Sequence, residues 1–208
     1  MTETLSLTAP RYTGALPPAR FNMAQYCLEA PARATPEKIA LRVVHDLAAP
    51  AEAAESWTYG GLEKAVRAVA AGLLESGLKP GERLMIRLPN TSDYALLFFG
   101  ALAAGIVPLP ASAQLTAREA SFLLADSGAR TVALGEGMEI DAAETQVLTP
   151  ADIARFKQGA PLVSYAPTRA DDPAYLVYTS GTSGNPKGVL HAHRAAWGRR
   201  PMYQDWYG

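Results

Sequence analysis

A twelve-residue segment at positions 178–189, YTSGTSGNPKGV, strongly limits what this chain can fold into. Apolar residues flank it on both sides, at 174–177 and at 189–190. Glycine, serine and threonine fill the space between them, so we expect a loop that joins two structured elements. Glycine lets backbone pass close to a bulky anion and adopt positive φ. Because the exposed N–H groups of such a loop form an anion-binding concavity, the segment predicts a site for nucleotide phosphates.

Side chains in the segment suit the same chemistry. Four Ser and Thr hydroxyls can donate hydrogen bonds, one lysine supplies a mobile positive charge, and Pro186 restricts the backbone just before that lysine. The simpler alternative is a Gly/Ser surface turn between two strands, and the concentration of these residue types in twelve positions argues against it. The predicted phosphate-binding residues are Thr179, Ser180, Gly181, Thr182, Ser183, Gly184 and Lys187.

The spacing excludes the two commonest nucleotide loops. A Walker A motif requires G-x-x-x-x-G-K-[ST], whereas Lys187 is preceded by Pro186 and followed by Gly188. A dinucleotide-binding G-x-G-x-x-G does not follow any predicted strand. A kinase or NTPase of the P-loop class is therefore disfavoured.

Strand-like and helix-like patterns alternate along the rest of the chain. Apolar residues recur at helical spacing between 62 and 74, and Thr116 with Glu119 forms a capping box that opens another helix. Such alternation predicts an α/β fold with parallel strands and helices against their faces. The remaining predicted elements are strands at 40–44, 83–88 and 130–134 and a short helix at 151–157.

One uncharged stretch, 94–117, has the length of a membrane span. Pro108 and Pro110 would break a spanning helix, and two glycines interrupt the stretch. We therefore expect a buried helix at about 92–104 followed by a strand at 106–109, and no membrane span.

The segment YTSGTSGNPKGV resembles the phosphate-binding signature of the adenylate-forming (AMP-binding) enzymes, which include acyl-CoA synthetases and the adenylation domains of peptide synthetases. Residues 21–43, 57–90 and 100–130 also resemble successive helices and strands of that family, so the resemblance covers nearly the whole chain from Phe21. HAHRAAWGRR after the loop is most similar to the acyl- and aryl-CoA ligase branch. The resemblance implies the N-terminal part of the family's large α/β domain, a mostly parallel sheet flanked by helices, incomplete in this chain.

The resemblance further implies a two-step reaction. A carboxylic acid attacks the α-phosphate of Mg²⁺-bound ATP to give an acyl adenylate, and CoA then displaces AMP to form a thioester. In this chain residues 179–184 and Lys187 would hold the β- and γ-phosphates. His193 matches a histidine that often follows the loop in the family, which places it at the nucleotide or acyl pocket, although a core or helix-capping role fits equally well. The acid itself is not specified by these residues.

Several functional parts of the family have no counterpart in these 208 residues. The acidic magnesium motif, the ribose-binding aspartate and the catalytic lysine of the C-terminal lid all come later in the family's sequences. We therefore expect an irregular leader at 1–20 and a partial AMP-binding domain at 21–208 that lacks the C-terminal half and the lid. No residue of this chain is predicted to be catalytic, and the alternative to a truncated ligase is a non-catalytic remnant that binds nucleotide or a partner.

Composition is consistent with a cytoplasmic location. The N-terminus has no secretory signal pattern, and the single cysteine, Cys27, suits a reducing compartment. Cys27 lies in an apolar helical pattern, so we expect it to pack rather than react. A net charge of −1 gives no reason to expect a nucleic acid or an anionic membrane as partner, even though aromatic and basic residues mix at 194–207. That segment is expected to pack as a helix against further parts of the enzyme.

Other candidate chemical groups carry less weight. His45, His191 and His193 lack an accompanying Cys or carboxylate cluster, which disfavours a metal site. Asp171 and Asp172 could be paired carboxylates, but with Pro173 they fit a turn that leads into a strand.

Overall fold

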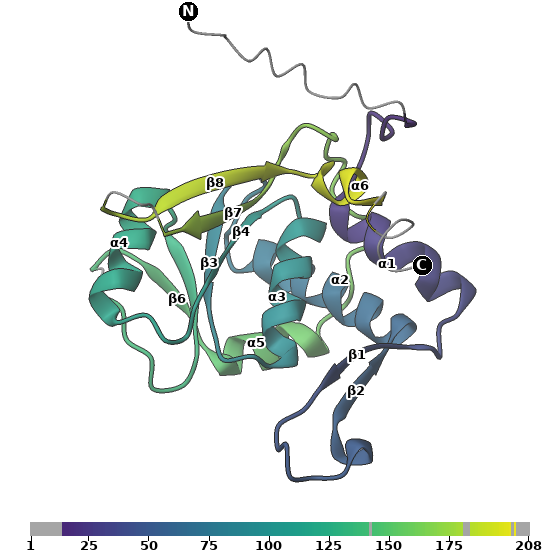
Figure 1. The fold of residues 1–208 in the computed structure, drawn as a ribbon, viewed down its shortest axis with the longest axis horizontal. Coiled ribbons are helices and arrows are strands. Elements are labelled where there is room, and N and C mark those ends of the chain that lie inside the picture. The colour runs from purple at the N-terminus through teal and green to yellow at the C-terminus, as the bar shows by residue number, and fades with distance from the viewer. Residues whose placement is uncertain (1–13, 142, 181–183, 201, 203–208) are drawn as a thin grey trace, which may run out of the picture.

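The computed structural model describes residues 14–141, 143–180, 184–200 and 202. A four-stranded parallel sheet, in the order β4-β3-β5-β6, forms the centre of this part of the chain (Figure 1). Two antiparallel two-stranded sheets accompany it, β1–β2 and β7–β8. The strands are β1 Ile39–Val43, β2 Glu55–Thr58, β3 Arg83–Arg87, β4 Val107–Ala111, β5 Thr131–Leu134, β6 Gln146–Leu148, β7 Pro173–Thr179 and β8 Lys187–Ala192.

Helices cover both faces of the parallel sheet, as the alternation predicts. The helices are α1 Met23–Ala34, α2 Tyr59–Glu75, α3 Ser92–Ala103, α4 Ala117–Ser127, α5 Pro150–Gln158 and the short α6 Ala195–Gly198, with a 3₁₀ turn at Ala51–Ala53. The expected buried helix and strand of the uncharged stretch are confirmed as α3 and β4. No helix in the described part of the chain is long and apolar enough to cross a membrane.

Side chains of β3 alternate between two apolar clusters. Leu84 and Ile86 point into the cluster formed with α1, α2, α3 and α5, whereas Met85 points into the cluster formed with α4. This is the period of two that a strand buried on both faces requires. The order of the layers is therefore α2, α3 and α5, then the sheet, then α4 (Figure 1).

Two glycines allow the helices of the first layer to pack at very short range. A Cβ on Gly72 of α2 would lie 2.3 Å from the Phe156 ring of α5, and one on Gly100 of α3 would lie 2.8 Å from Val69 of α2. Neither position has room for a side chain without movement of a neighbouring element. Close contact of α2 with α3 and α5 thus depends on glycine.

Threonine side chains cap three helices. Thr58 accepts from the Gly61 N–H at the start of α2, and Thr116 forms the predicted capping box with Glu119 at the start of α4. A second capping box, Thr149 with Asp152, opens α5, which the sequence predicts as a short helix at 151–157. Each cap satisfies helix N–H groups that have no partner within the helix.

Two prolines of β4 explain why the β7–β8 hairpin does not extend the parallel sheet. The Val107 N–H faces β3's side of the strand, where it donates to Glu82 O over 2.8 Å. N–H groups of a strand point alternately to its two sides, so residues 108 and 110 face away from β3. Both are prolines, and β4 therefore lacks hydrogen-bond donors on the side away from β3. β7 packs beside β4, and the two strands share no ladder among the described residues.

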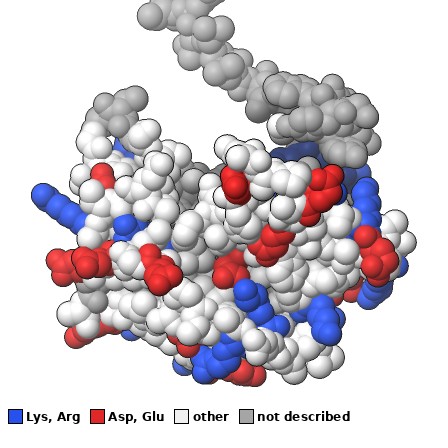
Figure 2. Space-filling view, turned by 90° about the horizontal axis from the view of Figure 1, so that it is seen from below, with Lys and Arg blue, Asp and Glu red and all other residues white. Residues whose placement is uncertain are grey.

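Charged residues of both signs are interspersed over the face that Figure 2 shows. This arrangement agrees with the net charge of −1, and this face presents no extended basic patch. Electrostatic attraction to a polyanion has no support from it.

Candidate nucleotide-phosphate site

The predicted phosphate-binding segment lies at the turn of the β7–β8 hairpin. Thr179, the last residue of β7, pairs with Lys187, the first residue of β8. Figure 1 shows the Thr179–Lys187 end of the hairpin beside α4 and its open end near α1 and α6. The apolar flanks recognised in the sequence are thus two antiparallel strands.

The structure brings the described loop residues to the surface. Thr179, Ser180, Gly184 and Lys187 are all exposed, whereas the predicted site residues 181–183 lie outside the described part of the chain. Gly184 adopts φ +117°, and a Cβ there would meet nothing within 4 Å. Glycine at this position is therefore required by backbone conformation and not by space.

Lys187 makes no ion pair with any described residue, although acidic side chains engage several other cations of the chain. Its position at the first pair of the hairpin holds its backbone while leaving the side chain in solvent. An unpaired lysine beside hydroxyl and N–H donors can bind an anionic group as a point charge.

The strand that carries the loop is anchored by apolar side chains. Ala174 and Tyr175 of β7 are buried in the cluster with α1 and α3, and Leu176 is buried in the cluster with α4. Tyr178 packs against the α4 cluster as well, and its Oη donates to Asp126 Oδ2 over 2.5 Å. Sequence reasoning missed this bond because its partners are 52 residues apart and no local pattern links them.

His193 caps a helix in this structure. Its ring is 1% exposed, and Nδ1 accepts from the Met23 N–H over 3.0 Å at the start of α1. Asn22 accepts from the next two N–H groups of the same helix. Burial lowers the pKa of His193 to about 4 and outweighs the opposing effect of Asp172. The arrangement is the capping alternative raised by the sequence, and contact with a nucleotide stays a prediction.

The other two histidines have separate partners. His45 contacts the Glu55 carboxylate over 3.0 Å, and the His191 ring stacks on Tyr175 at 4.5 Å between centroids. Throughout the described residues, no group of three or more His, Cys, Asp and Glu side chains is placed to hold a metal. The described residues thus do not supply a set of Mg²⁺ ligands, and no step of the chemistry is assigned to Mg²⁺ here.

Two further sequence interpretations concern local packing. Asp172 accepts from the Arg169 N–H over 2.7 Å and Asp171 pairs with Arg194 over 2.8 Å, which confirms the turn before β7. Burial raises the pKa of the Cys27 thiol, and this favours the packing interpretation because the reactive thiolate is disfavoured.

Trp197 of the predicted aromatic helix packs within this chain. Its ring lies 5.9 Å from Phe21 and 5.6 Å from Tyr26, and its Nε1 donates to the Ala15 carbonyl over 2.7 Å. Packing of this segment against further parts of the enzyme stays a prediction. The aromatic residues at 203, 206 and 207 lie outside the described part of the chain.

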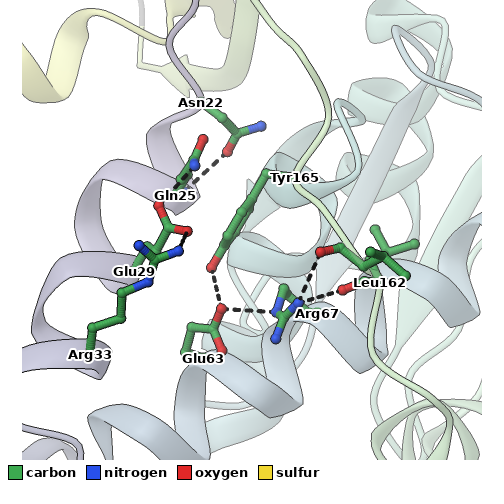
Figure 3. Close-up of polar contacts among 9 residues, drawn as sticks. Asn22, Gln25, Glu29, Arg33, Glu63, Arg67, Leu162 and Tyr165 are labelled. Atoms are coloured by element: carbon green, nitrogen blue, oxygen red, sulfur yellow. Dashed lines mark hydrogen bonds and ion pairs between the residues drawn. The ribbon is translucent and has the colours of Figure 1, made fainter.

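A polar cavity of about 370 Å³ lies between α1, α2 and residues 163–165. Figure 3 shows Tyr165 pointing between the two helices, where its Oη donates to Glu63 Oε1 over 3.0 Å. Glu63 pairs with Arg67, whose guanidinium also donates to the Leu162 carbonyl over 2.6 Å. The network holds the segment after α5 against α2.

Comparison with known proteins agrees with this geometry. The family model of the AMP-binding enzymes matches residues 28–204. The chain therefore belongs to the AMP-binding enzyme family.

Two similar proteins are CoA ligases. The chain is 32% identical over 150 residues to the long-chain-fatty-acid–CoA ligase FadD13 of Mycobacterium tuberculosis, with 66% of this chain and 30% of the ligase covered. It is 35% identical over 158 residues to the 4-hydroxybenzoate–CoA/benzoate–CoA ligase of Rhodopseudomonas palustris, with 66% and 29% covered. The chain thus spans about 30% of the length of these relatives.

Solved structures give the same fold. The inhibitor-bound N-terminal domain of FACL13 from Mycobacterium tuberculosis superposes with a TM-score of 0.72 at 27% identity, covering 85% of this chain and 46% of that domain. VinN in complex with 3-methylaspartate gives a TM-score of 0.77 at 24% identity, covering 92% and 54%, and supports the fold alone. The predicted fold class, the N-terminal part of the large domain of adenylate-forming enzymes, is confirmed.

Proposed function

We propose that this chain supplies the ATP-phosphate-binding part of an acyl-CoA synthetase. In the proposed reaction a carboxylic acid is activated with ATP as an acyl adenylate, and CoA then takes the acyl group as a thioester. The observation that carries the proposal is a Gly/Ser/Thr loop whose described residues are exposed at the end of a partly buried strand, in a member of the AMP-binding family. Beside this loop Lys187 makes no ion pair with any described residue.

The loop would act by position and charge. Its N–H and hydroxyl groups would hold the β- and γ-phosphates, which leave as pyrophosphate, and Lys187 would neutralise part of the charge that develops on them. β7 would keep the loop in place, because its residues 174–176 are buried in the two apolar clusters. The substrate class, a fatty or aromatic carboxylic acid, follows from the names of the relatives and belongs to the proposal.

The remaining chemistry belongs to segments that the relatives have and these 208 residues do not match. Ribose contacts, Mg²⁺ ligands, the acyl pocket and the CoA site are all proposed to come from the other 70% of such an enzyme. The domain boundaries 21–208 and a cytoplasmic location belong to the same proposal. We expect the 208-residue chain to bind nucleotide phosphates without catalysing carboxylate-dependent ATP–pyrophosphate exchange.

Binding can be tested on this chain directly. A fluorescent ATP analogue is titrated into the protein, and pyrophosphate and AMP are added as competitors. Pyrophosphate should displace the analogue more effectively than AMP, because the loop is proposed to hold the β- and γ-phosphates.

Lys187→Gln should weaken binding about tenfold, the size expected for loss of a charge-assisted contact. Lys38→Gln is the matched control, since Lys38 is equally exposed but lies in the turn before β1. Absence of binding at millimolar nucleotide, or equal affinities for the two variants, would overturn the proposal.

A further inference from the structure

Tyr178 connects the loop-bearing hairpin to helix α4. It lies one position before Thr179, whose pairing with Lys187 closes the hairpin, and it is paired across the hairpin with Gly188. Its ring packs against the apolar cluster formed by α4 and the parallel sheet. Any movement of the loop end of the hairpin relative to α4 must therefore displace this side chain.

Gly188 leaves room for the Tyr178 ring beside the neighbouring strand. A Cβ at Gly188 would lie 3.3 Å from Tyr178 Cζ and 3.2 Å from Leu176 Cδ1, which is tighter than ordinary van der Waals contact. The ring thus fills the space above Gly188 and reaches α4 with its hydroxyl. Three segments, α4, β7 and β8, meet at this side chain.

The hydroxyl donates to Asp126 Oδ2 over 2.5 Å. Asp126 is the penultimate residue of α4, where the helix dipole disfavours a negative charge, so the carboxylate gains from a hydrogen-bond donor. Arg83 donates to the adjacent Ser127 carbonyl, and its charge acts on the Tyr178 hydroxyl. Burial and the Asp126 carboxylate raise the pKa of Tyr178, so its hydroxyl remains a proton donor at neutral pH.

We propose that Tyr178 is a positioning residue whose hydrogen bond to Asp126 holds the hairpin against α4 and so fixes Thr179 and Lys187, the strand ends that flank the phosphate loop. This inference rests on the proposed function of the loop. It adds that the affinity for phosphates depends on a contact outside the loop, the hydrogen bond between Tyr178 and Asp126.

The chain contains a matched control for this bond. Tyr165 also donates its hydroxyl to a carboxylate, that of Glu63, but it does so between α1 and α2 (Figure 3). Tyr165→Phe removes a bond of the same chemistry away from the hairpin. A general loss of stability would affect both Phe variants, whereas loss of loop positioning would affect Tyr178→Phe alone.

Amide hydrogen exchange and nucleotide affinity provide the two measurements, both on the 208-residue chain. In Tyr178→Phe we expect exchange of residues 175–179 and 187–191 to become about three- to tenfold faster, because a hydrogen bond to a charged group is lost. The affinity for the fluorescent ATP analogue should fall by a similar factor. Tyr165→Phe should leave the exchange rates and the affinity at their wild-type values. Asp126→Asn keeps an acceptor oxygen, so its exchange rates and affinity should be closer to wild type than those of Asp126→Leu.

Each other outcome has a definite meaning. Unchanged hairpin exchange in Tyr178→Phe would overturn the inference, as would faster exchange with unchanged nucleotide affinity. If the wild-type chain binds no nucleotide, the proposed function fails by itself. The exchange measurement then still decides whether the bond holds the hairpin to α4.

Discussion

The parallel sheet and the β7–β8 hairpin use their strands in opposite ways. Four of the five residues of β3 are buried, whereas none of the six residues of β8 is. Because helices cover β3 on both faces, its side chains must be apolar and must fit the packing of both layers, as is usual for parallel sheets. β8 has a neighbour on one side only and is free to carry glycine, lysine and an exposed loop. The parallel sheet thus supplies the rigid framework, and the hairpin carries the candidate phosphate loop. β7, which is partly buried, connects the hairpin to that framework.

The largest effect on stability should come from the centre of the parallel sheet. Ile86 is fully buried, and Ile86→Ala would leave a cavity that β3 cannot close because helices pack against it on both faces. We expect a loss of about 2–5 kcal/mol in the free energy of unfolding. Urea denaturation followed by far-UV circular dichroism measures it. A loss below about 1 kcal/mol would show that β3 is not tightly packed on both faces and would weaken the contrast with the hairpin.

A smaller but substantial loss is expected where two helices of the first layer touch. Gly72→Ala would place a methyl group 2.3 Å from the Phe156 ring and force α5 away from α2. Overpacking of this kind costs about 1–3 kcal/mol. Gly61→Ala is a control in the same helix, because its new Cβ would meet only the Thr58 hydroxyl, at 3.3 Å. Equal melting temperatures for the two variants would contradict the predicted crowding at α5.

Acid should loosen the base of the hairpin before it affects the sheet. The pKa of His193 is lowered to about 4 in the fold, so between its ordinary value and 4 the unfolded chain binds a proton that the folded chain does not. Stability contributed by the neutral ring is therefore complete above about pH 6.5 and falls as the pH drops toward 4, by at most about 1.4 kcal/mol per pH unit.

Denaturation curves at pH 7, 6 and 5 measure this contribution. His193→Gln retains an acceptor for the Met23 N–H and cannot be protonated, so it should flatten the dependence between pH 6.5 and 5. Glu119 and Asp152, whose pKa values are lowered by their capping bonds, lose their contributions only at lower pH. An unchanged slope in His193→Gln would show that another group titrates in this range.

The smallest effect is expected on the outer strand. Leu190 is 48% exposed and Val189 42%, so Leu190→Thr removes little buried surface. We expect a change within about 0.5 kcal/mol. Binding of a hydrophobic dye should decrease measurably, because exposed apolar groups on an edge strand are a site of dye binding and association. A loss comparable with that of Ile86→Ala would abolish the distinction between the two sheets.

Local patterns predicted the parallel part of the fold well. Helical periodicity marked α2, the capping box at Thr116 marked α4, and Pro108 with Pro110 separated α3 from a following strand. β6 was missed because three residues are too few to show a period. The second capping box is not evident from the sequence pattern, since Thr149 is followed by Pro150 and its partner, Asp152, is neither Glu nor Gln.

Long-range arrangements could not be predicted in the same way. Alternating strands and helices favour parallel pairing, and nothing local shows that β1–β2 and β7–β8 are antiparallel hairpins. Loop chemistry identified the candidate phosphate site, but the contact that links it to α4 joins residues 52 positions apart. For His193 the sequence left two roles open; the bond from the Met23 N–H supports helix capping, and contact with a nucleotide stays a prediction.

The cap that His193 places on α1 has a consequence for the order of folding. Met23 and His193 are separated by 170 positions, so the N-terminal end of α1 cannot be completed until residue 193 has been synthesised. At a translation rate of about 5–20 residues per second, the helix would wait roughly 10–30 s on the ribosome for its partner. During that interval α1 can already pack on α2 and α3, but the Met23 N–H at its start still lacks the acceptor that His193 provides.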